Sequence, residues 1–381
     1  KTEVNHSLNI NVQNRKTESN NSKESVLICK LRIKSYQRDV RNLHLEFQSG
    51  LKVLDLEGKL HLGELVKLRQ LDMELFGGCN YSCSMCPQGS EKGREPEFKK
   101  ALSWLNFMKI VDDAVEHGVE SISLHGGGEP TLNKYFISCI KYIKKKGIQC
   151  TSLSNGYNLD DYLIDKLIDS GIDIFKISVV GYDEQTYEKM MSKNAFKYVR
   201  ENVKNLVRQT KGSNTRVQSQ HLILDPKKKD YEVEQLRKNW IDYTGIDAEI
   251  WLMHNWSGTY EGKYERSKED RRGCGRPSQP MLQVRAGGLG KHQGAVVACC
   301  MVLGNDASAT LGHLDDQTIE EVYNGDKYKE LRDAHEEERF DDIPYCKDCD
   351  QLYHVPESLV WTNMKNRKYK QSKVLDSLEI Q

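Results

Sequence analysis

The sequence of 381 residues predicts an α/β fold, a partial and open (β/α)6 barrel followed by a small C-terminal α+β domain. Between residues 70 and 257, short apolar runs alternate with amphipathic helical stretches. This alternation predicts a parallel sheet covered by helices, because consecutive parallel strands are usually connected by a helix. These crossovers are almost always right-handed. The six predicted units are fewer than the eight that close a TIM barrel. After about residue 256 the alternation stops and cysteines gather, which indicates the second domain.

The six predicted strands are short and rich in apolar residues. They cover residues 71–76, 119–124, 148–153, 173–179, 217–224 and 248–253. Amphipathic periodicity predicts the helices between them. They are expected near 101–117, 134–146, 158–170, 195–207 and 231–243. Gly118, Gly147 and Gly171 follow three of these helices and are expected to end them, whereas Asn158 is expected to cap the third at its start.

Composition divides the rest of the chain. Residues 1–24 are a polar tail that we expect to be disordered, and residues 25–69 form an N-terminal element that the sequence assigns to no fold. The small domain is expected over residues 258–360, with a C-terminal tail over 361–381.

Charge and hydropathy exclude several classes of partner. The 56 Lys and Arg residues balance 56 Asp and Glu residues, so we expect no nucleic-acid partner. No apolar stretch reaches the roughly 18 residues of a membrane helix, and we expect no membrane association. The first 24 residues lack the apolar core of a secretion signal. The 11 cysteines are therefore expected to be reduced in the cytoplasm, where clustered cysteines usually hold metal.

The first cysteine group comes three residues after the first predicted strand, at the end where ligands sit in parallel α/β folds. Cys79, Cys83 and Cys86 offer three thiolates in one short loop. A [4Fe–4S] cluster normally takes one thiolate on each of its four irons. This group can therefore hold a cluster with one open iron, whereas a structural zinc ion would lack its fourth ligand.

This Cys-x3-Cys-x2-Cys run resembles the hallmark of the radical S-adenosylmethionine (SAM) superfamily, over roughly residues 70–256. In that family the open iron binds S-adenosylmethionine, and one electron from the cluster yields a 5′-deoxyadenosyl radical. The resemblance implies an external one-electron reductant such as flavodoxin or ferredoxin. The position before the third cysteine is often aromatic in the family, and here it is Met85.

Other family positions follow the later strands in order. The run Gly127-Gly128-Glu129 matches a GGE motif that holds the methionine amino group in the family, and a carboxylate beside bare backbone suits an ammonium ligand. Polar residues at the next strands resemble the family's contacts to the cofactor carboxylate and ribose, although they could also be simple caps. The expected cofactor-binding residues are Gly127, Gly128, Glu129, Ser154, Asn155, Ser178, Gln218, Gln220 and His254.

The second cysteine group resembles the SPASM and twitch extensions, which bind auxiliary iron–sulfur clusters in this superfamily. Cys274, Cys299, Cys346 and Cys349 would complete the ligands of a second, auxiliary [4Fe–4S] cluster. The longer, two-cluster SPASM form needs further cysteines that this chain lacks, so the resemblance implies the twitch form. A four-cysteine zinc site fits the same spacing and remains an alternative.

Cys300, beside Cys299, separates two possible reactions. If the substrate radical loses an electron to the auxiliary cluster and a proton to a base, an alcohol becomes a ketone; this resembles twitch dehydrogenases that act on aminocyclitols. If Cys300 returns a hydrogen atom instead, the product is an epimer. A free cysteine can also be a packing residue.

The leading interpretation is therefore a dehydrogenase of a small, polar, sugar- or aminocyclitol-like molecule. Candidate groups for binding this substrate are His254, Asn255, Arg276, Arg285 and His292. Maturation of a ribosomal peptide is an alternative, although residues 25–69 are short for the usual peptide-binding module. A non-catalytic iron–sulfur or zinc scaffold is an alternative of another class, but it gives the glycine–glutamate motif no role.

Overall fold

The computed structural model describes residues 68–261, 271, 274–303, 306–352 and 359–364, and the short strands β1 (Val53–Leu54) and β2 (Leu60–His61). The chain divides into two compact units, residues 1–64 and 65–381. In the first unit β1 pairs antiparallel with β2. The predicted tail over residues 1–24 lies outside the described residues, as does most of the N-terminal element.

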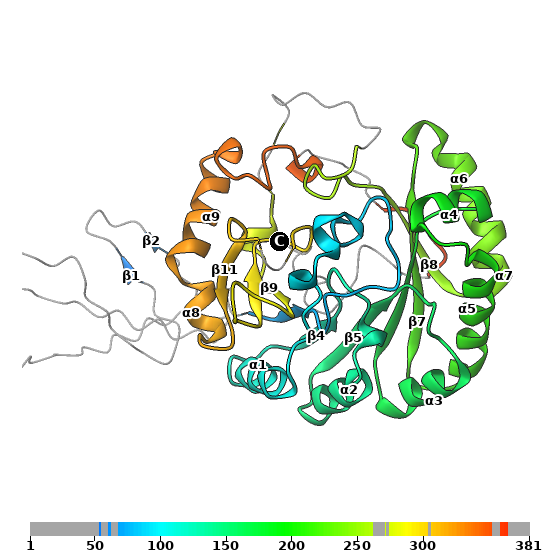
Figure 1. Ribbon diagram of the computed structural model, residues 1–381, viewed down its shortest axis with the longest axis horizontal. Coiled ribbons are helices and arrows are strands. Elements are labelled where there is room, and N and C mark those ends of the chain that lie inside the picture. The colour runs from blue at the N-terminus through cyan, green and yellow to red at the C-terminus, as the bar shows by residue number, and fades with distance from the viewer. Residues whose placement is uncertain are drawn as a thin grey trace, which may run out of the picture. The chain divides into compact units, whose positions relative to one another are not determined.

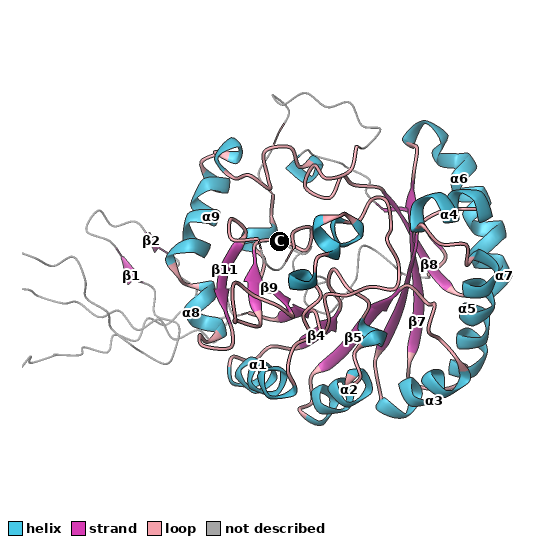
Figure 2. Ribbon diagram, in the orientation of Figure 1, coloured by secondary structure: helices cyan, strands magenta, loops and turns pink. Residues whose placement is uncertain are grey.

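A curved sheet of ten described strands organises the second unit, with helices along its outer side (Figures 1 and 2). Its order is β11-β10-β9-β3-β4-β5-β6-β7-β8-β12. Six neighbouring strands are parallel: β3 (Gln70–Met73), β4 (Ser121–Leu124), β5 (Gln149–Ser154), β6 (Ile174–Val179), β7 (Arg216–Ile223) and β8 (Asp247–Leu252). The partial (β/α)6 barrel is confirmed. It stays open because β3 and β8 pair with further strands instead of with each other.

The helices follow the predicted order. They are α1 (Trp104–Glu116), α2 (Phe136–Lys145), α3 (Asp161–Ser170), α5 (Phe196–Thr210), α6 (Lys229–Leu236) and α7 (Asp242–Thr244), with a π-helical turn at Arg237–Ile241 joining the last two. Gly118, Gly147 and Gly171 have φ angles of 67°, 78° and 74° just after three helices, as expected of residues that end them.

Two local expectations were wrong or incomplete. Asp160, not Asn158, caps α3, because its side chain accepts a hydrogen bond from the Leu163 amide at 2.7 Å. The Asn158 side chain instead donates to the Thr131 hydroxyl at 3.0 Å. The additional helix α4 (Glu184–Met191) begins with a capping box in which Asp183 and Thr186 satisfy each other's backbone amides.

Alternation along the strands separates an apolar outer face from a polar inner face. In β3, Leu71 and Met73 belong to the main core with residues of α1 such as Phe107. On the other face Gln70 and Asp72 hydrogen-bond to one another, and Asp72 also accepts from Gln283 at 2.7 Å. The inner face of the barrel is therefore the side that can take a polar ligand.

The small α+β domain continues the barrel sheet. β9 (Met281–Arg285) lies parallel to β3, and β10 (Ala295–Val297) and β11 (Thr310–His313) follow antiparallel. The helices α8 (Ile319–Tyr323) and α9 (Asp326–Glu336) complete this part. At the opposite edge β12 (Leu359–Thr362) pairs with β8, across the predicted boundary at residue 360. No described helix combines the length and hydrophobicity needed to span a membrane.

Candidate active site and auxiliary metal centre

The first cysteine loop leaves the carboxyl end of β3. Cys79, Cys83 and Cys86 share this loop, and the Cys86 amide donates to the Cys83 carbonyl at 3.1 Å. Burial raises the pKa of Cys79 to about 11, and it raises the pKa values of Cys83 and Cys86. Repulsion from neighbouring thiolates adds to this effect for Cys79 and Cys83, and repulsion from Glu74 adds to it for Cys86. Three partly buried thiols with raised pKa values become thiolates only beside a strong positive charge. The donor set therefore fits the irons of a cluster.

A glycine turn after β4 packs directly on this loop. The Glu129 amide donates to the Gly78 carbonyl at 2.9 Å. A Cβ on Gly128 would lie 2.0 Å from the Phe76 carbonyl oxygen, so no side chain fits at this position. The backbone of the turn is thus held against the cysteine loop, as expected of a turn that contacts a ligand bound there.

The Glu129 carboxylate fastens this turn to the loop after β5. It is 3% exposed, and it accepts hydrogen bonds from the Ser154 hydroxyl and the Asn155 amide, each at 2.8 Å, and from Thr131. The Asn155 side chain reaches the Asn80 side chain at 2.7 Å in the cysteine loop. The structure therefore brings Glu129, Ser154 and Asn155 together. Their hydrogen bonds mainly connect the glycine turn after β4, the loop after β5 and the cysteine loop.

The remaining expected cofactor contacts lie along the inner face. Ser178 and Gln220 are register partners on β6 and β7 and are partly exposed, whereas Gln218 is buried deeper in the barrel. His254 follows β8 and packs on Trp256, with ring centroids 3.8 Å apart. Burial lowers the pKa of His254 to about 3.

The second cysteine group lines a single cavity. Cys274, Cys299, Cys346 and Cys349 surround a space of about 410 Å³, together with the apolar side chains of Pro277, Ala298, Leu331 and Leu352 and with His335. Burial raises the pKa of Cys346 to about 12 and that of Cys349 to about 11. Four thiols around one largely apolar cavity are a complete donor set for a fully ligated cluster.

A larger cavity of about 940 Å³ lies between the two cysteine groups. The first cysteine loop forms one side of it through Cys83, Met85 and Cys86. Residues Met301–Leu303 of the small domain form part of the other side. Ser257 and Tyr345 line both this cavity and the auxiliary one. The two cavities therefore share part of their lining.

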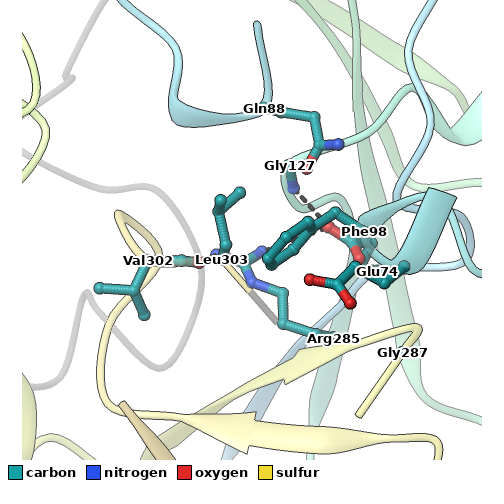
Figure 3. A pocket seen from close by; sticks show the side chains of 9 residues that line it. Glu74, Gln88, Phe98, Gly127, Arg285, Gly287, Val302 and Leu303 are labelled. Atoms are coloured by element: carbon teal, nitrogen blue, oxygen red, sulfur yellow. Dashed lines mark hydrogen bonds and ion pairs between the residues drawn. The ribbon is translucent and has the colours of Figure 1, made fainter. Parts of the chain in front are cut away.

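A third, smaller cavity of about 260 Å³ lies beside the glycine turn and contains an ion pair (Figure 3). Arg285 lies 3.7 Å from Glu74, and both side chains are almost fully buried. Glu74 also accepts from the Gly127 amide at 2.5 Å. Val302 and Leu303 line this cavity and the 940 Å³ cavity, so the two adjoin. Sequence reasoning missed Glu74, whose only signal was a polar residue at the end of an apolar strand.

Cys300 does not line the auxiliary cavity, and its thiol lies beside Cys299 and near Arg276 and Arg285. Its carbonyl oxygen accepts a hydrogen bond from Arg285 at 2.8 Å. A hydrogen bond with Cys299 and the positive charges of Arg276 and Arg285 lower the pKa of the Cys300 thiol. His125, which sequence reasoning also missed, is close enough to contribute to the same effect.

The other candidate substrate groups are scattered. Arg276 lines the auxiliary cavity. Asn255 donates to the Asp348 carbonyl at 2.7 Å and accepts from the Asp350 amide at 3.1 Å, which positions the loop that carries Cys349. His292 is exposed, pairs with Asp315 at 3.2 Å and lines none of these three cavities.

Comparison with known families agrees with this geometry. Residues 73–225 match the Radical SAM superfamily, and residues 291–350 match SPASM, an iron–sulfur cluster-binding domain. The chain therefore contains a radical SAM domain followed by a SPASM-type iron–sulfur domain. The predicted family, the S-adenosylmethionine cofactor with its [4Fe–4S] cluster, and the auxiliary iron–sulfur centre are thereby confirmed. The SPASM match includes Cys299, Cys346 and Cys349 but not Cys274, whose place rests on the cavity alone.

Several curated proteins are related to this radical SAM chain over part of its length. A probable GTP 3′,8-cyclase of Methanococcus maripaludis is 30% identical over 142 residues, which are 37% of this chain and 46% of the relative. A tungsten-containing aldehyde ferredoxin oxidoreductase cofactor-modifying protein of Pyrococcus furiosus is 29% identical over 113 residues, 29% of this chain and 31% of the relative. The chain spans less than half the length of these curated relatives.

Solved structures share the fold of this radical SAM protein. Streptococcus suis SuiB bound to precursor peptide SuiA has a TM-score of 0.55 at 15% identity, over 70% of this chain and 67% of that chain. Native anSMEcpe with bound AdoMet has a TM-score of 0.52 at 13% identity, over 77% of this chain and 92% of that chain. At these identities the likeness concerns the fold alone.

Proposed function

We propose that this radical SAM enzyme is a dehydrogenase that oxidises an alcohol carbon of a small, polar, sugar- or aminocyclitol-like substrate, with the auxiliary cluster as electron acceptor. The observation that carries the proposal is the wall shared by the two cavities. Ser257 and Tyr345 line both the cavity at the first cysteine loop and the cavity of the second cysteine group. A substrate radical formed in the first cavity would thus lie beside an electron acceptor in the second.

The Glu74–Arg285 pair supports a polar substrate. The Arg285 Nε is buried and has no hydrogen-bond partner among the described residues, so it can donate to a substrate hydroxyl. Glu74 accepts from hydroxyl or ammonium groups. A molecule that carries both kinds of group would bind both members of the pair, whereas an apolar substrate would leave the Arg285 Nε without a partner at a cost of about 1–3 kcal/mol.

The proposed oxidation balances as follows. The bound cofactor and clusters supply removal of a hydrogen atom from carbon and acceptance of one electron. The hydroxyl proton must then leave for the carbon–oxygen double bond to form, and Glu74 is the proton acceptor that we assign. Arg285 holds the hydroxyl oxygen in place. The overall change is the loss of two hydrogens from a secondary alcohol.

A second candidate function is epimerisation, with Cys300 as the hydrogen-atom donor. It is favoured by the position of Cys300 beside Arg285, which lines the cavity next to the glycine turn. Peptide maturation rests on the likeness to SuiB, which shows the fold alone. For the dehydrogenase we further propose a cytoplasmic location and a flavodoxin or ferredoxin as the external reductant.

The test is anaerobic reconstitution with reductant, S-adenosylmethionine and a panel of aminocyclitols and amino sugars in deuterated water. We expect 5′-deoxyadenosine together with a product two mass units lighter than its substrate, for both the wild type and Cys300→Ala. An epimer carrying solvent deuterium, made by the wild type and lost in Cys300→Ala, would establish the second candidate instead. Absence of 5′-deoxyadenosine with every substrate, and in slow uncoupled turnover, would contradict both.

A further inference from the structure

His335 also lines the auxiliary cavity, together with the four cysteines. It lies in the last turn of α9 and is buried. Its ring packs edge-on against Phe340, with centroids 5.5 Å apart, which fixes its orientation. The sequence gives no hint of this role, because a single histidine on a helix is more often a core or surface residue.

The hydrogen bonds of His335 determine which ring nitrogen carries its proton. The backbone amide of Cys274 donates to Nδ1 at 3.3 Å. A backbone amide can only donate, so Nδ1 is the acceptor and the ring proton is on Nε2. Nε2 lies 3.5 Å from Cys346 Sγ, so its N–H points at the sulfur. His335 thus joins two of the four cysteines, accepting from one and donating to the other.

We propose that His335 donates an N–H···S hydrogen bond to the Cys346 thiolate of the auxiliary cluster and thereby raises the reduction potential of that cluster. The physical reason is that the added electron increases the negative charge on the ligand sulfurs, so a donor stabilises the reduced state more than the oxidised one. Hydrogen bonds to cluster sulfurs are among the features that set such potentials. His335 is therefore a positioning and tuning residue, not a ligand.

This inference rests on the presence of an auxiliary cluster and not on the proposed dehydrogenation. It would hold equally for an epimerase or a peptide-modifying enzyme. The competing assignment is that His335 binds iron directly in place of Cys274 or Cys346, which would require Nε2 to be free of its proton.

The first experiment measures the auxiliary cluster alone, in the full-length chain carrying Cys79→Ala, Cys83→Ala and Cys86→Ala. In this background we compare His335→Phe, which removes the donor, with His335→Gln, which keeps an N–H group. Potentiometric titration followed by electron paramagnetic resonance should give a more negative midpoint potential for His335→Phe, and one closer to that of the parent for His335→Gln.

The matched control is His313→Phe in the same domain. The His313 Nε2 accepts from the Leu289 amide at 3.1 Å, and His313 does not line the auxiliary cavity. The midpoint potential of the auxiliary cluster should be the same in His313→Phe as in the parent protein. An equal shift in the control, or an unchanged potential in His335→Phe with a full iron content, would overturn the proposal. So would loss of the auxiliary iron in both His335 variants, because that result points to a ligand.

A second measurement detects the histidine nitrogen directly. Full-length protein in the same three-alanine background, grown with ¹⁵N-labelled histidine, is studied by pulsed electron paramagnetic resonance of the reduced auxiliary cluster. We expect a weak nitrogen coupling that is absent in His335→Gln, as for a nitrogen one hydrogen bond away from a ligand sulfur. A strong coupling, typical of an iron–nitrogen bond, or the absence of any coupling, would refute the hydrogen bond.

Discussion

The Arg285 guanidinium lies 3.7 Å from the Glu74 carboxylate, and it also donates to the carbonyl oxygens of Cys300 and Val302 at 2.8 and 3.0 Å. One buried cation thus joins the first barrel strand, through Glu74, to the segment that follows Cys299. Glu74 comes shortly before the loop with the first cysteine group, and Cys300 directly follows the auxiliary cysteine Cys299. The contacts of Arg285 with Glu74 and with the Cys300 carbonyl therefore connect the two cysteine groups.

Removing one member of this pair should destabilise the fold. We expect Arg285→Met to lower the free energy of unfolding by about 3 kcal/mol, because Glu74 would be left buried and unpaired. Adding Glu74→Gln to Arg285→Met should recover part of this loss. Denaturant unfolding of variants with equal iron content measures these changes in the free energy of unfolding. The exposed pair Arg69–Glu120, joined at 2.9 Å, is the control: Arg69→Leu should cost less than about 1 kcal/mol. Equal losses at the two sites would contradict the structural role of Arg285.

Gly128 should be essential for assembly of the first cluster. In Gly128→Ala the new methyl group would meet the backbone of Phe76 and Gly78, neither of which can move without displacing the cysteine loop. We expect iron to fall from about eight to about four per chain, because each cubane cluster holds four irons. Gly275→Ala is the control, since a Cβ at Gly275 meets no heavy atom within 4 Å. Full iron content and normal S-adenosylmethionine cleavage in Gly128→Ala would show that the turn can adapt.

The strand and helix order was accessible from sequence because apolar periodicity is a local signal. The continuation of the sheet from β3 into β9 could not be predicted from the sequence. β9 is buried along its whole length, including Gln283 and Arg285, so it shows no alternation that would reveal its pairing with β3. The capping box of α4 is equally easy to miss, because Thr186 stands where a Glu or Gln is usual.

The cysteine ligands could be predicted because their spacing carries the information. Glu74 and His335 could not, because each is a single residue whose meaning depends on a partner far away in the sequence, Arg285 for one and Cys274 for the other. Glu129 was identified from its motif, but the motif does not reveal that Ser154 and Asn155 satisfy its carboxylate.

His221 should make the fold less stable in acid. Burial lowers its pKa to about 3 in the folded chain, against about 6.5 when unfolded. Between these values the unfolded chain binds the additional proton, so stability rises with pH and is lost as pH falls from about 6.5 toward 3. The slope from this group approaches 1.36 kcal/mol per pH unit. Urea unfolding at pH 5.5 and 7.5 should show a smaller difference for His221→Gln than for the wild type. An unchanged difference would mean that other groups dominate the acid response.

Cys274 and Cys300 should respond in opposite ways to the same substitution. Cys274 lines the auxiliary cavity with three other cysteines, so Cys274→Ser should remove or weaken the auxiliary cluster and bring iron toward about four per chain. Cys300 is adjacent to a ligand but does not line that cavity, so Cys300→Ser should keep about eight irons. Iron and sulfide analysis after anaerobic reconstitution gives both values, and production of 5′-deoxyadenosine verifies that the first cluster is intact in each variant. If Cys300→Ser loses the auxiliary iron while Cys274→Ser retains it, the ligand set must include Cys300 in place of Cys274.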